Sequence, residues 1–200
     1  MIEPILWGLA LAATAGLRLF MPFLFVGALA RYAGTPTPEM LAWTASDAGF
    51  LLLLIATLVE ILGDKIPAVD HALDAGATFI KPAAGLILPV ALLQDTSPMA
   101  AWTLGIIAGA PLALGVHTTK AGTRALSSAT TLGTGNPIIS TFEDALAVLI
   151  LVLTAIAPIV AVLLVAILSY FVIRALRRMG RLLGRRKAEA PDGSYPPGAP

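Results

Sequence analysis

Residues 5–30 read I-L-W-G-L-A-L-A-A-T-A-G-L-R-L-F-M-P-F-L-F-V-G-A-L-A, an apolar run whose one charged residue is Arg18. The run exceeds the ~20 residues that an α-helix needs to cross a bilayer core. Pro22 lies four residues after Arg18 and has no amide hydrogen to donate to the carbonyl of Arg18. The sequence therefore predicts a membrane helix that is weakened beside an intramembrane charge.

Further apolar runs follow at residues 48–63, 69–93, 100–116 and 142–176. As one straight helix the last run would be ~50 Å long, so we expect two segments meeting near Pro158, or one strongly kinked helix. Residues 118–140, rich in Thr, Ser and Gly, resemble neither an ordinary span nor an ordinary loop. We expect an all-α polytopic membrane bundle of about six short or proline-broken segments, with five spans as an alternative. The predicted helix breaks are at Pro22, Pro67, Pro82, Pro111, Pro137 and Pro158.

The composition excludes an ordinary soluble domain. Apolar residues make up 58% of the chain and charged residues 12%, against the roughly 25% charged residues of soluble proteins. The mean hydropathy is +0.88. There is no cysteine, which excludes disulfides and cysteine metal sites. Glu3 stands where a signal peptide would carry basic residues, so we expect the first run to be retained as a span.

Charge divides the chain into an acidic body and a basic tail. Residues 174–187 (Arg174 to Lys187) carry seven of the thirteen basic residues and no acid. The positive-inside rule then predicts a multi-pass membrane protein with a cytoplasmic C-terminus. We expect one transmembrane domain over residues 1–180 and a disordered tail over 181–200. The tail is also suited to contact with anionic lipid.

Four acids and one histidine gather around the junction of the second and third runs: Glu60, Asp64, Asp70, His71 and Asp74. The first two carboxylates are one helical turn apart, and so are the last two, so each pair shares a helix face. Two carboxylates and an imidazole suit proton transfer or a divalent cation. They are equally compatible with structural ion pairs near helix ends, and the metal interpretation, on Asp70, His71 and Asp74, is the alternative.

A second polar group begins at His117, where Lys120 and Arg124 are one helical turn apart. Hydroxyls and amides follow, and cations beside such groups suit phosphate or carboxylate. The sequence thus predicts substrate binding by Arg18, Lys120, Arg124, Ser127, Ser128 and Asn136. The competing interpretation is an interfacial loop. Glu143 and Asp144 open the next helix, where they could stabilise its N-terminus or neutralise an arginine.

Two further cations, Lys65 and Lys81, adjoin the acids, and Lys81 lies two turns after Asp74 on the same face. A Lys81–Asp74 pair is therefore predicted. Together with Arg18, Lys120 and Arg124, the two lysines make five cations in or beside the membrane runs, against six acids. This near balance favours a paired polar core over a pure anion channel. The match between A-G-L-R at 15–18 and A-G-T-R at 121–124 suggests two inverted three-segment repeats.

Several motifs made of these residues resemble a family of small bacterial inner-membrane proteins, the domain of unknown function numbered 4126. They are G-L-R-x-F-x-P (16–22), G-D-K-I-P-x-x-D-H (63–71), F-I-K-P-A-A-G (79–85), H-x-x-K-A-G-x-R (117–124), N-P (136–137) and E-D (143–144). The resemblance covers residues 5–178. It implies a bacterial inner-membrane protein of this size and brings no substrate with it.

Three functions compete on this sequence. The first is a secondary transporter or flippase for a small anionic substrate held by Arg18 and Arg124, with acids as counter-charges. The second is a cation or metal carrier or channel centred on Glu60–Asp74, and the third is a membrane scaffold. No hydrolase, metalloprotease or nucleotide motif is present, so we expect no enzyme, no cofactor and no nucleic-acid partner. The bilayer is the expected partner, and a homo-oligomer is compatible with the sequence.

Overall fold

The computed structural model describes residues 2–188, without the side chains of residues 67, 68, 70–75, 172, 173, 175–177 and 179–188. Within that range the chain is all-α, as predicted, with no strand. The elements are α1 (Ile2–Leu17), α2 (Met21–Tyr32), the 3₁₀-helix η1 (Glu39–Ala45), α3 (Asp47–Gly63), α4 (Pro67–Leu93), α5 (Pro98–Leu104), the π-helical η2 (Gly105–Gly109), α6 (Ala110–Thr131), α7 (Asn136–Ile156) and α8 (Pro158–Ala188).

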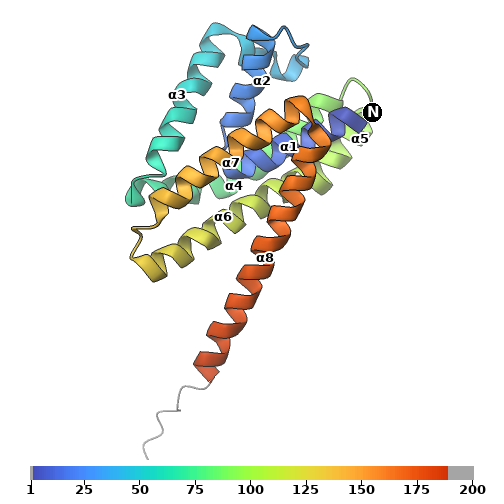
Figure 1. Ribbon diagram of the computed structural model, residues 1–200. Coiled ribbons are helices and arrows are strands. Elements are labelled where there is room, and N and C mark those ends of the chain that lie inside the picture. The colour runs from blue at the N-terminus through green and yellow to red at the C-terminus, as the bar shows by residue number, and fades with distance from the viewer. Residues whose placement is uncertain (1, 189–200) are drawn as a thin grey trace, which may run out of the picture.

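Helix α1 lies at the centre of the bundle and contacts α4, α6, α7 and α8 (Figure 1). Its second half is buried without interruption, because small residues let the neighbouring helices approach closely. A Cβ atom on Gly16 would lie 2.5 Å from the carbonyl oxygen of Ala113 on α6. Between α4 and η2 the same holds for Gly85, whose added Cβ would lie 2.6 Å from the carbonyl oxygen of Gly109.

The predicted first span is two helices separated at residues 18–20. α1 ends at Leu17, and α2 begins at Met21 with Pro22 in its first turn, so the chain breaks where the Arg18–Pro22 spacing indicated. At 16 and 12 residues, each helix is shorter than the ~20 residues of a full span. α2 then packs beside α3 and η1, and the axes of η1 and α3 differ by 76°.

The predicted prolines fall in two groups. Pro22, Pro67, Pro137 and Pro158 stand in the first turns of α2, α4, α7 and α8, at helix breaks as predicted. The predicted break at Pro82 is wrong, because α4 continues through Pro82 and Pro89 to Leu93. Neighbouring helices can hold a membrane helix together across a proline. Pro111 lies in the first turn of α6, which begins at Ala110, but Pro98–Thr131 is one continuous helical run through η2, so the predicted break at Pro111 is also wrong.

The second half of the chain contains a tight turn and a projecting helix. Residues 118–131, whose character the composition left open, belong to α6, and Leu132 then turns the chain at a φ of 55°. α7 ends at Ile156 and α8 begins at Pro158, which confirms the break expected there. α8 projects from the bundle (Figure 1) and continues to Ala188, past the predicted domain end at residue 180.

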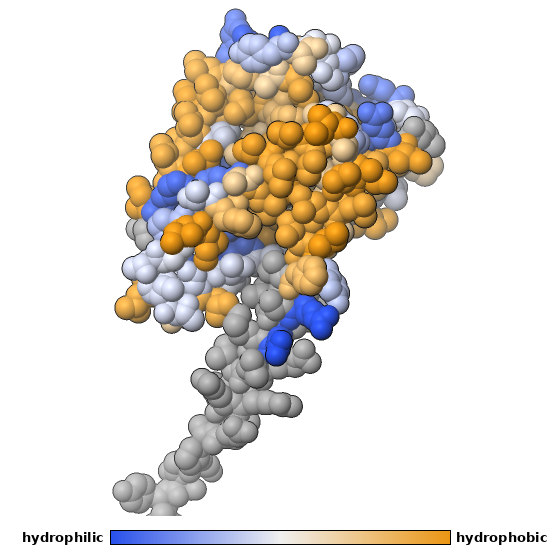
Figure 2. Space-filling model, viewed as in Figure 1, coloured by the Kyte–Doolittle hydropathy of each residue, from blue (hydrophilic) through white to orange (hydrophobic). Residues whose placement is uncertain are grey.

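The apolar helices indicate a membrane protein. Among the described residues, three helical runs are long and apolar enough to cross a membrane: Gly76–Leu93, Pro98–Thr131 and Asn136–Ile156, with η1 and α3 as a fourth if the bent pair counts as one span. α1, α2 and Pro158–Phe171 are shorter apolar helices. Figure 2 shows apolar side chains over most of the visible face, with hydrophilic residues where α3 begins. An exposed surface of this kind contacts a bilayer.

Candidate functional site

The interruption between α1 and α2 leaves backbone groups that neither helix can pair. The carbonyl of Leu17 accepts a hydrogen bond from Lys81 Nζ at 3.2 Å. The amides of Leu19 and Phe20 donate to the two carboxylate oxygens of Glu60, at 2.8 and 3.3 Å. Lys81 Nζ also lies 3.9 Å from Glu60 Oε1. One acid and one lysine from neighbouring helices therefore cap the two broken ends.

Asp64, directly after α3 and 3% exposed, is the point where the cations converge. Its Oδ2 atom accepts hydrogen bonds from Arg18, from Lys120 Nζ at 2.7 Å and from Arg124 Nη2 at 3.0 Å. Lys120 and Arg124 reach it together because they are one turn apart on α6, as their spacing predicted. Lys120 Nζ also donates to the carbonyl of Leu17 at 3.4 Å. A single carboxylate oxygen thus carries three cationic donors.

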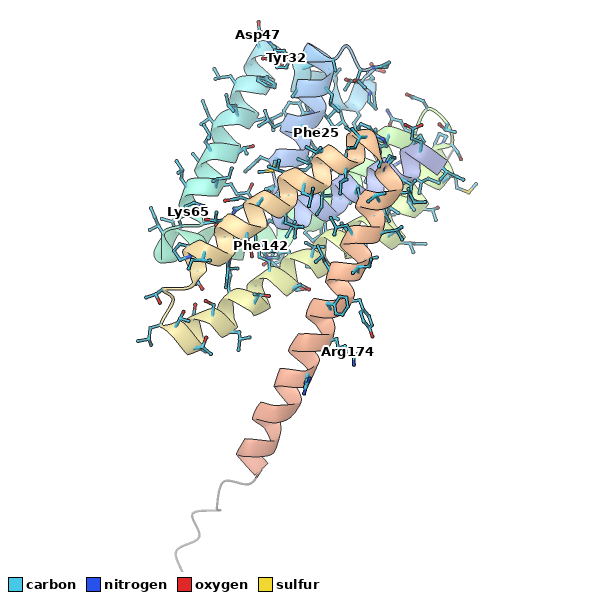
Figure 3. The ribbon with its side chains drawn as sticks, viewed as in Figure 1. Phe25, Tyr32, Asp47, Lys65, Phe142 and Arg174 are labelled. Atoms are coloured by element: carbon cyan, nitrogen blue, oxygen red, sulfur yellow. The ribbon has the colours of Figure 1, made fainter. Side chains whose placement is uncertain are left out.

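Two acids on α7, Glu143 and Asp144, pair with the same cations. Glu143 Oε2 accepts from Arg124 Nη2 at 2.7 Å. Asp144 pairs with Arg18 through Oδ1 at 2.5 Å and with Lys65 Nζ through Oδ2 at 3.0 Å. Figure 3 shows Lys65 near the first half of α7. The prediction that these acids neutralise an arginine is confirmed for both.

We call the nine ionisable side chains that meet here the charge cluster: Arg18, Lys65, Lys81, Lys120, Arg124, Glu60, Asp64, Glu143 and Asp144. Arg18 is fully buried and Lys81 is 1% exposed. Five cations and four carboxylates belong to it, while the side chains of Asp70 and Asp74, two of the six acids in the predicted balance, lie outside the described residues. Burying ions is favourable only when partners compensate them, and the partners here come from α3, α4, α6 and α7 and from the α1–α2 and α3–α4 connections. The described side chains therefore form a paired polar core, as the sequence predicted.

Ser140 on α7 belongs to the cluster and was missed in the sequence. It is fully buried, and its Oγ lies 3.1 Å from Arg18 Nη2, which donates to it. Its carbonyl oxygen accepts from the same nitrogen at 3.4 Å. The signal was its position three and four residues before Glu143 and Asp144, which places it on their face of the helix.

The polar residues predicted to line a substrate site with the cations lie towards the α6–α7 turn. Asn136 Nδ2 donates to Ser128 Oγ at 3.0 Å, and the Ser127 hydroxyl lies 3.4 Å from that of Thr131. The first contact joins α6 to the start of α7, the second lies within α6, and neither includes a residue of the charge cluster. His117, 2% exposed, has its Nε2 atom 3.1 Å from Thr78 Oγ1.

The predicted metal alternative falls on side chains outside the described residues. These are Asp70, His71 and Asp74 at the start of α4, and the predicted Lys81–Asp74 pair falls there too. Among the described side chains no group of three or more His, Asp or Glu residues could hold a metal ion. The cation hypothesis therefore gains no support from the described part of the chain.

A cavity of about 190 Å³ opens beside the cluster, between α1, α6, α7 and α8. Its charged lining consists of Lys120 and Glu143, whose Nζ and Oε2 atoms are 3.6 Å apart. The rest is mainly apolar and includes Leu17, Val116, Phe142, Leu146, Ile150 and Val165. An apolar hollow thus ends on one edge of the charge cluster.

Comparison with known proteins gives a family without an assigned activity. The sequence model of the family described as Domain of unknown function (DUF4126) matches residues 5–178. No curated protein and no solved structure matches the chain. The matched range contains every described residue of the charge cluster and of the cavity.

Proposed function

The chain belongs to the DUF4126 family of unknown function, and we propose that it is a small membrane carrier, a secondary transporter or flippase, for a phosphate- or carboxylate-bearing substrate. One observation carries the proposal: Arg18, Lys120 and Arg124 all donate to one carboxylate oxygen, Asp64 Oδ2. Asp64 occupies this position as an anion that belongs to the chain. A substrate anion would bind the same three cations when Asp64 withdraws.

Arg18 has a donor that no described acid uses. Its buried Nε atom has no hydrogen-bond partner among the described residues. A phosphate group offers several strong acceptor oxygens and more charge than a carboxylate. Arginine is also suited to planar, bidentate recognition of such groups. These properties favour an anionic substrate over a cation.

The broken helix beside the cluster supports a carrier. Transporters place substrates at discontinuous helices, whose N-terminal ends attract anions and whose freed carbonyls attract cations. Here Glu60 binds the amides at the start of α2, and Lys81 binds the carbonyl at the end of α1. Asp64 lies outside helix α3, in the turn to α4, so it can move without unwinding a helix. The chain's own charges thus occupy the positions that an anionic substrate would take.

The proposal extends to topology and location. The A-G-x-R match would relate Arg18 to Arg124 through inverted repeats, although α6 is continuous at Arg124 while the chain breaks at Arg18. Arg174 and Arg178 are exposed on the projecting part of α8. This supports a cytoplasmic C-terminus in a bacterial inner membrane by the positive-inside rule.

Chemical rescue tests the anion site. Asp64→Ala leaves three cations without their shared acceptor, which should cost about 3–5 kcal/mol of stability. Formate, acetate and inorganic phosphate, titrated against chloride at constant ionic strength, should each raise its thermal midpoint in a saturable way. If Asp64→Ala does not fold, the titration uses Asp64→Asn, which keeps the side-chain volume. The matched control is Asp47→Ala, whose carboxylate is 95% exposed and pairs with Arg31 at 2.8 Å.

The same titration separates a carrier from a static ion-paired core. A carrier has a path wide enough for phosphate, so phosphate should stabilise the Asp64 variants but not Asp47→Ala. A static core admits at most formate into the space that the side chain vacates. Stabilisation by no anion, or by formate alone, would overturn the proposal.

A further inference from the structure

Glu143 shares two cations with a second carboxylate of the charge cluster. Its Oε2 atom lies 2.7 Å from Arg124 Nη2 and 3.6 Å from Lys120 Nζ. Both nitrogens also contact Asp64 Oδ2, at 3.0 and 2.7 Å. One acid belongs to α7 and the other to the α3–α4 turn, so the two cations connect separate parts of the fold. If Glu143 loses its charge, both cations keep a carboxylate partner.

The other acids of the cluster hold different groups. Glu60 accepts from the amides that open α2, and Asp144 joins Arg18 to Lys65. Asp64 also holds Arg18, and under the proposed function it is the acid that the substrate replaces. Glu143 is therefore the acid whose charge is duplicated at the same two cations while the substrate enters beside it.

Glu143 also lies where its neutral form can be accommodated. It is 6% exposed and lines the cavity of about 190 Å³, whose walls are mainly apolar. Its neighbour Phe142 lines the same cavity and lies between α6 and α7 (Figure 3). Next to apolar side chains an uncharged carboxyl group costs far less than a carboxylate. The cavity thus favours an acid that can exist in both forms over one that must stay ionised.

The charged groups around Glu143 come from three neighbouring parts of the chain and from α7 itself. They are Lys120 and Arg124 on α6, Arg18 in the α1–α2 connection, Asp64 and Lys65 in the α3–α4 turn, and Asp144 on α7. Helices α1, α2 and α8 also pack against α7. The cavity lining from α1 and from the described part of α8 contains no ionisable side chain: Ala13, Leu17, Val165, Leu168 and Ser169. The ionisable residues of α2 lie in its last turn: Arg31 and Tyr32.

From this arrangement we infer that the carrier moves its anion together with a proton, and that Glu143 holds the proton. The inference rests on the proposed function and adds its coupling ion. A monovalent anion brings one negative charge into a buried site, and an uncompensated buried charge is costly. One proton taken from water by a carboxylate oxygen of Glu143 cancels that charge. Arg124 and Lys120 then turn from Glu143 to the incoming anion, and the proton leaves when the anion leaves.

The pH dependence of anion binding tests the coupling. The full chain is placed in phosphatidylcholine nanodiscs, and the affinities of the unmodified protein and of Glu143→Gln for inorganic phosphate and for acetate are measured between about pH 5 and pH 8. The ratio of the two proteins' affinities cancels the ionisation of the anion itself. Glu143→Gln imitates the protonated acid, so it should bind about tenfold or more tightly at the alkaline end. This advantage should shrink as the pH falls, by up to about tenfold per pH unit.

A matched control separates protonation from the mere loss of an acid. Asp144→Asn removes the next acid on the same helix, and its affinity relative to the unmodified protein should stay nearly constant with pH. If Glu143→Gln does not fold, calorimetry of sulfate binding to the unmodified protein in two buffers of different ionisation enthalpy replaces it. Sulfate does not titrate in this range, so about one proton should be taken up for each sulfate bound.

The outcomes keep this inference apart from the proposed function. A Glu143→Gln advantage that is constant with pH, or no proton uptake with sulfate, overturns the coupling and leaves the anion carrier standing. Weaker binding by folded Glu143→Gln at every pH also overturns it, because Glu143 would then only position the cations. Binding of neither phosphate nor acetate by the unmodified protein at any pH overturns both.

Discussion

Replacing Glu60 tests the capping of the broken helix. Glu60 is 7% exposed, accepts from the amides of Leu19 and Phe20, and faces Lys81 Nζ at 3.9 Å. Glu60→Gln keeps one acceptor oxygen, so one amide loses its partner, which costs about 1–3 kcal/mol. Lys81 loses a buried counter-charge, and breaking such a pair costs about 3–5 kcal/mol. Because the two effects overlap, we expect a total of about 3–5 kcal/mol.

The double variant Glu60→Gln/Lys81→Met shows whether the pair is the cause. With both charges gone, only the unsatisfied amide and the reduced capping of the Leu17 carbonyl remain, so the loss should fall to about 1–3 kcal/mol. The assay is unfolding of the purified protein by increasing SDS fraction in mixed micelles, followed by helical circular dichroism. Asp47→Asn is the control, and its exposed carboxylate should give a change within about 0.5 kcal/mol.

Additive losses of stability in the double variant would contradict the capping argument. If the double variant loses as much stability as the sum of the two single variants, Glu60 and Lys81 do not compensate each other across the broken helix. A Glu60→Gln change within the range of the Asp47→Asn control would likewise refute the capping argument.

Two further predictions concern helix packing and the α6–α7 turn. Gly16→Val should destabilise the fold by several kcal/mol or prevent assembly, because a Cβ there would lie 2.5 Å from Ala113 O and 2.7 Å from Val116 Cβ. The control in the same unfolding assay is Gly76→Val, because a Cβ on Gly76 would have no neighbouring atom within 4 Å. Leu132→Gly should raise the midpoint, since a left-handed φ of 55° costs a leucine about 1 kcal/mol and the side chain is 94% exposed. A lower midpoint for Leu132→Gly would contradict it.

Local spacing was enough to predict which residues share a face and where the first helix breaks. Arg18 and Pro22 indicated the break between α1 and α2. The one-turn spacing of Lys120 and Arg124 brought both to Asp64. The identity of that partner, 60 residues from Arg124, depends on how the fold brings the turn between α3 and α4 next to α6, and spacing along the chain carries no information on such packing.

Hydropathy was less informative about which apolar helices face lipid. The first run was predicted as one span, but α1 is a short helix buried in the bundle, and a central helix is as apolar as a lipid-facing one. The break predicted at Pro82 did not occur because neighbouring helices support α4. Residues 118–131 are helical although they are rich in Thr, Ser and Gly, and hydroxyls such as those of Thr123 and Thr130 are satisfied within the helix by carbonyls one turn earlier, at 3.0 Å.

Movement of a phosphate-bearing probe across a bilayer tests the central claim most directly. The chain is reconstituted into phosphatidylcholine liposomes, and two probes are followed in time: uptake of radiolabelled inorganic phosphate, and protection from dithionite of a fluorescent lysophosphatidic acid in the outer leaflet. Lys120 donates to Asp64 Oδ2, so Lys120→Met should slow the probe that moves about tenfold or more, a change of ~1.4 kcal/mol in the barrier. Lys120→Arg and Asp47→Asn should retain more of the rate. Movement of neither probe faster than in protein-free liposomes, or an unchanged rate in folded Lys120→Met, would contradict the account.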